Sequence, residues 1–182
     1  MTKRKTMFFD NDCISAFLWV DNTDIITELY GDNIFVPTEV YNELIACQGP
    51  ALKLKTQIEQ MINNKKAFRV DMNVNSDEYS LFTELAIDPP NGERIIGKGE
   101  AACIALAKEQ HGLIASNNLK DISKYIERYS LAHTTTADIL VEAFDKGIVS
   151  KAETEQLWAE MLSKRRRLGA NSFEEYLRMI GK

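Results

Sequence analysis

Four segments of the sequence carry residue types that bind divalent metals. In FFDNDCISAF, Asp10 directly follows a short apolar run and Asp12 comes soon after it. Carboxylates in apolar surroundings are costly unless a partner balances their charge. Glu43 lies in VPTEVYNELI and Glu100 in GKGEAACIALAKEQ. A divalent cation would relieve the repulsion among these acids, and such oxygen ligands favour Mg²⁺ or Mn²⁺.

The fourth segment, IASNNLKDI, offers amides and one further acid. Asn118 can give a neutral oxygen to a metal but adds no charge, and Asp121 could supply the missing carboxylate. Ser116 is a further candidate in this stretch, and Asp12 is expected to hold the loop or a metal-bound water. The predicted catalytic and metal-binding set is Asp10, Glu43, Glu100, Asn118 and Asp121.

Each candidate also has a structural interpretation. Asp10 and Asn118 could cap the helices that follow them. Glu100 could favour a helix N-terminus through the helix dipole, a role compatible with metal binding. Glu39 lies one helical turn before Glu43 and competes with it for the same role.

Short apolar strands alternate with helical patterns along the chain. The expected strands are 6–9, 33–36, 67–70, 113–115 and 131–134, and the expected helices are 12–30 with a break near 21–23, 37–45, 51–63, 76–86, 100–110, 119–129 and three that begin near 136, 150 and 172. This alternation predicts an α/β fold, a three-layer α/β/α sandwich with a short parallel sheet of four to five strands. In such sheets ligands bind beyond the carboxyl ends of the strands, which is where the candidate residues fall.

These four motifs, in this order and spacing, resemble those of the PIN-domain nucleases, of the kind found in VapC-type toxins. The resemblance covers about residues 7–134, and the region 135–182 is similar to the helical extension of one PIN-like subgroup. It implies a single PIN-like domain over 1–182, with 135–182 packed on it as that extension. It also implies a metal-dependent ribonuclease toxin that is inhibited by a small antitoxin and forms a homodimer. Where many members have Asp, this chain has Asn118.

Two other functions remain open at this point. The chain could be a PIN fold that has lost activity and binds RNA or a protein, and Asn118 favours that interpretation. FFDND also resembles the opening Asp-x-Asp of haloacid dehalogenase-type phosphatases, although SNN follows the fourth expected strand where that family needs acids. The basic run 164–167 is expected to be a solvated helix end, with phosphate binding as the alternative.

Composition narrows the class of protein. The chain has 182 residues, 45% of them hydrophobic and 27% charged, which suits one domain with its own core. A net charge of −5 argues against a protein that coats nucleic acid through a positive field. Three scattered cysteines indicate neither a zinc site nor a disulfide framework. The basic start MTKRKT lacks a following apolar signal region, and no apolar run reaches membrane-spanning length, so we expect a cytoplasmic location.

Overall fold

Five parallel strands form one sheet in the order β3-β2-β1-β4-β5. The computed structural model describes residues 5–182, apart from the side chain of residue 91, and the basic start at 1–4 lies outside this range. The strands are β1 (Met7–Phe9), β2 (Ile34–Pro37), β3 (Phe68–Val70), β4 (Leu113–Ala115) and β5 (Ala132–Thr134). Met7 pairs with Ile34 on one side and with Leu113 on the other, so β1 is the central strand.

Ten α-helices connect and cover these strands within the described residues. They are α1 (Asn11–Trp19), α2 (Asp24–Tyr30), α3 (Thr38–Ile45), α4 (Leu52–Asn63), α5 (Asp77–Ala86), α6 (Lys98–Glu109), α7 (Leu119–Tyr129), α8 (Thr136–Asp145), α9 (Lys151–Ser163) and α10 (Phe173–Met179). Three short 3₁₀ helices lie at Gly31–Asn33, Gly49–Ala51 and Pro90–Gly92. Strong caps mark several starts: Ser76, Thr135, Ser150 and Ser172 each accept a bond from the backbone N–H three residues later.

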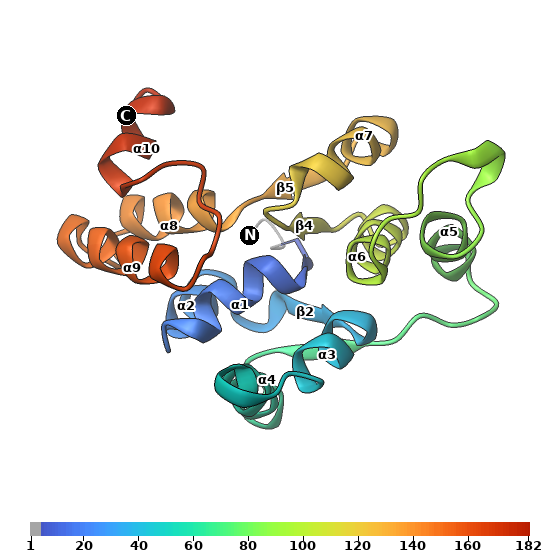
Figure 1. The fold of residues 1–182 in the computed structure, drawn as a ribbon, viewed down its shortest axis with the longest axis horizontal. Helices are drawn as coiled ribbons and strands as arrows, with labels where there is room; N and C mark the ends of the chain where they lie inside the picture. Colours follow the sequence, from blue (N-terminus) through green and yellow to red (C-terminus); the bar gives the residue numbers. More distant parts are fainter. Residues whose placement is uncertain (1–4) are drawn as a thin grey trace.

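The helices cover both faces of the sheet (Figure 1). From β1 the chain steps outward to β2 and β3, whereas β4 and β5 extend the sheet in the opposite direction. Because parallel crossovers are right-handed, this reversal places α5, α6 and α7 on the face opposite to α1 and α2. The contacts agree, since α6 touches α5, α7 and the strands β1, β2 and β4, while α1 touches α4, α8 and α9.

The core fixes the elements that carry the candidate site. Phe8 and Phe9 of β1 are fully buried, and the rings of Phe8 and Phe35 lie 6.1 Å apart between neighbouring strands. In α6, every residue from 101 to 107 is fully buried, and most of them are alanine. Such small side chains allow the helix to lie between the sheet and α5 with little free space. The first turn of α6, which carries Glu100, is therefore held firmly against the end of the sheet.

The structure confirms the predicted α/β class with an all-parallel sheet, now counted at five strands. Helix boundaries agree closely with those expected, including the break between α1 and α2 near Asp21. Pro37 differs slightly, because it ends β2 and immediately precedes α3 instead of lying in its first turn. Cys13 and Cys103 are buried free thiols and Cys47 is half-buried. None of the helices at 5–182 has the length and apolar content needed to cross a membrane.

Candidate active site

The candidate residues gather where the two central strands end. The connection pattern reverses between β1 and β4, and this switch point is where parallel sheets open a crevice beyond their carboxyl ends. The backbone N–H of Asp10 continues the ladder by donating to the carbonyl of Ala115 at 2.9 Å. Asp10 and Ser116 are thus the first residues beyond two paired strands, and their side chains meet.

Asp10 is the most buried acid of the site. Its residue is only 3% exposed. One carboxylate oxygen accepts from the backbone N–H of Asn11 at 2.7 Å, and the other accepts from the Ser116 hydroxyl at 2.9 Å. Burial, followed by repulsion from Asp12 and Glu100, raises the pKa of Asp10 well above its usual range. No basic side chain forms an ion pair with Asp10 within the described residues.

Asp12 is held by the loop that follows β4. Its carboxylate accepts from the backbone N–H of Asn117 at 3.1 Å. The Asn117 side chain in turn bonds α8, donating to the Thr136 hydroxyl and accepting from the Thr136 backbone N–H, both at 2.8 Å. Burial is the main cause that raises the pKa of Asp12. Asn117 therefore ties α1, the β4 loop and α8 together beneath the site.

Glu43 comes from the last turns of α3 and is exposed. Its carboxylate accepts from the side-chain amide of Asn11 at 2.9 Å. Glu39, the competing acid one turn earlier, lines a separate, neighbouring cavity of about 580 Å³ that also touches Glu43 and the aromatic rings of Tyr79 and Phe82. Of the two acids, Glu43 is the one that lines the cavity with Asp10.

Glu100 and Asp121 share one amide. The side-chain nitrogen of Asn118 donates to Glu100 at 2.9 Å and to Asp121 at 2.8 Å. Asn118 occupies the position before the first residue of α7, yet its side chain makes no capping bond to that helix. The amide instead separates two carboxylates and satisfies one oxygen of each. This contact explains how an uncharged residue at 118 stabilises the acidic cluster.

Two glycines make room for the carboxylates. A Cβ atom at Gly99 would lie 3.1 Å from a carboxylate oxygen of Asp10 and 3.4 Å from one of Glu43. A Cβ atom at Gly97 would overlap the Glu100 carboxylate, which folds back over the start of α6. A larger side chain at either position would require the carboxylates of these acids to shift. The space around the acids is therefore a feature of the sequence as well as of the fold.

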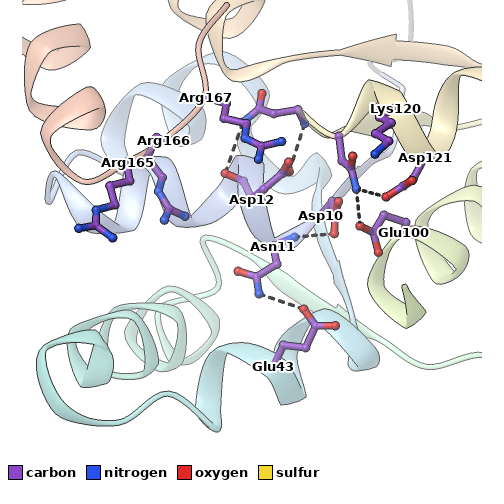
Figure 2. Close-up of a pocket in the computed structure, with 12 residues that line it drawn as sticks. Asp10, Asn11, Asp12, Glu43, Glu100, Lys120, Asp121, Arg165, Arg166 and Arg167 are labelled. Carbon is purple, nitrogen blue, oxygen red and sulfur yellow. Dashed lines mark hydrogen bonds between the residues drawn. The ribbon is translucent and has the colours of Figure 1, made fainter. Parts of the chain in front are cut away.

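The acids and their amide partners line one cavity of about 530 Å³ (Figure 2). It is lined by Asp10, Asn11, Asp12, Glu43, Glu100, Asn117, Asn118, Lys120, Asp121, Arg165, Arg166 and Arg167. Asp10 and Asp12 lie near its middle, Glu100 and Asp121 on one side, and the arginines on the other. The five predicted site residues thus come together, although their roles as ligands stay a prediction.

The donor set fits a hard divalent cation. It consists of carboxylate and amide oxygens, which Mg²⁺ and Mn²⁺ prefer, and the glycine at position 99 lets Asp10 and Glu43 lie close to the start of α6. In the structure, Glu43, Glu100 and Asp121 accept hydrogen bonds from side-chain amides. Within residues 5–182, no three acidic, His or Cys side chains lie close enough together to hold one ion. Asp10 would be the central ligand, with Glu43 and Glu100 beside it.

The structure is a parallel α/β fold with acids gathered in one cavity beyond the carboxyl ends of its strands. The family comparison agrees with this class, because the PIN domain profile matches residues 6–182. The chain belongs to the PIN domain family, whose members are generally nucleases and typically use divalent metals. The match includes the three C-terminal helices. No curated protein matches the sequence.

Sequence reasoning did not single out Asn11, Asn117 or Lys120 as lining the site. Asn11 was visible between two candidate acids, but nothing in its own residue type predicts the bond to Glu43. Asn117 stood beside Asn118, and only the tertiary contact with Thr136 reveals its part. His133 donates to or accepts from no acid of the site; its ring nitrogen lies 2.9 Å from the Ser116 carbonyl.

Proposed function

We propose that this protein is a metal-dependent ribonuclease that hydrolyses phosphodiester bonds of RNA. The observation that carries the proposal is Asp10: a buried carboxylate at the end of the central strand, opening into a solvent-connected cavity, with no basic partner among the described residues. Asp10 is also the N-cap of α1, as its structural interpretation expected, but a helix cap does not need a buried carboxylate whose ionisation burial and neighbouring acids both oppose. Membership of the PIN domain family supports the same activity.

Asp10, Glu43 and Glu100 would hold Mg²⁺ or Mn²⁺, with Asn118 or Asp121 completing the set. The ion supplies an activated water at neutral pH and charge stabilisation for the phosphate oxygens. The chain contributes the placement of these groups: Ser116 and the Asn11 backbone orient Asp10, and Asn117 orients Asp12. Gly97 and Gly99 let the carboxylates of Glu100, Asp10 and Glu43 pack close to the start of α6. No side chain is required as a covalent nucleophile.

The biological role that we propose is that of the toxin in a toxin–antitoxin pair, located in the cytoplasm. A small antitoxin protein and a second copy of the chain are its proposed partners. The support is the resemblance of the four motifs to VapC-type PIN nucleases. Co-purification of a small protein that suppresses cleavage would test the pairing, and light scattering of the purified chain would test the dimer.

A second function is favoured by one contact. The side-chain amide of Asn118 donates hydrogen bonds to both Glu100 and Asp121. These two acids therefore have a partner without a metal ion, which is an arrangement that a non-catalytic binding module could keep. The family match argues for a PIN fold and against the haloacid dehalogenase alternative.

The deciding experiment incubates the purified protein with a mixed RNA pool in Mn²⁺, in Mg²⁺ and with a chelator. We expect cleavage in metal and none with the chelator. Asp10→Asn should be inactive, whereas Asp32→Asn, at an exposed acid outside the cavity, should match the parent. RNA that remains intact with every metal would reject the ribonuclease in favour of the binding module, and release of phosphate from small phosphoesters would point to a phosphatase.

A further inference from the structure

Three successive arginines line the acidic cavity from a part of the chain distant in sequence from every acid. Arg165, Arg166 and Arg167 follow the end of α9 and face the cavity opposite Glu100 (Figure 2). Five carboxylates and four basic side chains therefore share one opening. The chain has a net charge of −5, and the run 164–167, which contains the three arginines, is its densest group of positive charge.

The three arginines form no ion pairs with acids of the described residues. None of the salt bridges formed within residues 5–182 involves Arg165, Arg166 or Arg167, although acids line the same cavity. Arg166 donates to the hydroxyl of buried Ser15 at 3.1 Å and to the carbonyl of Lys164 at 3.0 Å. These bonds fix one guanidinium and leave its other N–H groups free of protein acids.

The segment that carries them is anchored at both ends. After α9 the backbone N–H of Arg165 donates to Leu162 and that of Arg166 to Met161, which is the pattern of a Schellman helix end. Arg165 takes the left-handed position of that turn, with φ of 59°. Beyond the arginines, Leu168 is buried and the Trp158 indole donates to the Ala170 carbonyl at 3.1 Å.

Two further cavities adjoin the acidic one. Arg167 and Asn117 also line a cavity of about 230 Å³ that reaches Tyr176 of α10. On the other side, Glu43 also lines the cavity that Tyr79 and Phe82 border. Hollows on both sides of the acidic site suit an extended strand better than a small anion.

We propose that Arg165, Arg166 and Arg167 bind backbone phosphates of single-stranded RNA next to the phosphate that is cut. This inference rests on the proposed ribonuclease function and adds the residues that draw a polyanion into a cavity of acids. Guanidinium groups bind phosphate oxygens through paired, charge-assisted hydrogen bonds. The contact is to the backbone, so it positions the strand without reading its sequence.

The test separates binding from cleavage. Binding of a fluorescent single-stranded RNA is measured in chelator, where nothing is cut, over a series of salt concentrations. The variants are Arg165→Gly, Arg167→Gln and their combination, and Arg178→Gln on α10 is the matched control. Glycine is favoured at positive φ, so Arg165→Gly removes the side chain while keeping the turn.

We expect the combined variant to bind RNA roughly tenfold more weakly, and the slope of log affinity against log salt to fall by about 0.7 for each phosphate that the variant no longer neutralises. Arg178→Gln should bind like the parent. In metal, KM for RNA should rise by a similar factor while kcat stays near that of the parent. Unchanged affinity and KM in the combined variant would overturn the inference while leaving the ribonuclease intact.

If the parent binds RNA through the arginines but cuts nothing in any metal, the proposed function fails and with it the placement of the arginines beside a scissile phosphate, while their binding of the RNA backbone stands. Arginine-dependent binding of a polyglutamate peptide as tight as that of RNA of equal charge would overturn it, because the arginines would then serve an acidic protein segment. Melting curves of each variant establish that the fold is retained.

Discussion

The carboxylates of the cavity fall into two groups that are held differently. Asp10 and Asp12, the floor of the cavity, accept bonds from backbone N–H groups at the ends of β1 and β4 and from the Ser116 hydroxyl. Glu43, Glu100 and Asp121, the rim, accept bonds from side-chain amides. The sheet therefore dictates where the floor lies, whereas the rim depends on amides that an ion can displace. We therefore expect substitutions in the floor and in the rim to have different effects on stability and on metal binding.

The largest effect is expected at the floor. Asp10→Asn keeps the volume and one acceptor oxygen, for the backbone N–H of Asn11, but turns the other acceptor into a donor toward Ser116 and removes the charge. Cleavage of RNA should fall by more than about a hundredfold, beyond the usual cost of losing a residue that only orients a metal ligand. The same change should raise the melting temperature of the metal-free protein, because it removes the repulsion that Asp12 and Glu100 exert on a buried carboxylate. Calorimetry in chelator measures the second effect.

Added Mn²⁺ should raise the melting temperature of the parent and of Asp32→Asn, since a ligand of the native state stabilises it. Asp10→Asn should lose this rise. A parent that shows no shift at millimolar Mn²⁺ would count against the whole site, and an Asp10→Asn variant that shifts like the parent would remove Asp10 from the ligands.

The rim should respond in the opposite sense at Asn118. Asn118→Asp places a third carboxylate between Glu100 and Asp121, so the metal-free protein should melt at a lower temperature. With Mn²⁺ the added charge should tighten binding by roughly tenfold, about 1.4 kcal/mol. Asp121→Ala should weaken binding instead. Isothermal titration of Mn²⁺ into the parent and both variants decides the matter, and equal affinities in all three would leave Asn118 and Asp121 outside the metal site.

Gly99→Ala tests whether floor and rim meet beside α6. A methyl group there would press on both Asp10 and Glu43, so the affinity for Mn²⁺ should fall several-fold. The free energy of unfolding should change little, because alanine is up to about 1 kcal/mol better than glycine in a helix but its Cβ atom would also lie 3.1 Å from a methyl group of Val40. Gly147→Ala is not a suitable control, because Gly147 has a φ of 71° and alanine would be strained there. Alanine itself is compatible with α6, which already contains Ala101. Loss of stability with unchanged affinity would contradict this prediction.

The same division separates the parts of the site that could be predicted from the sequence from those that could not. Asp10 and the stretch after β4 were predictable because short apolar strands in a parallel sheet must end at one edge, and the residues after them are then neighbours. The bonds of Asn11 to Glu43 and of Asn117 to Thr136 were not, since they join residues 32 and 19 positions apart through side-chain packing. Nothing in the periodicity of α9 indicates that the arginines after it turn toward the cavity.

The smallest effect is expected at Asn11. Its amide donates to Glu43 at the solvent-exposed end of α3, and such a hydrogen bond typically contributes about 1 kcal/mol. In Asn11→Ala the backbone N–H that holds Asp10 remains, so the floor keeps its geometry. We therefore expect Mn²⁺ affinity and the metal-free melting temperature to change little, by less than about fivefold and 2 °C. A loss of activity as large as that of Asp10→Asn would show that Asn11 itself acts on the ion or the RNA, and the separation of floor from rim would then be wrong at the residue that touches both.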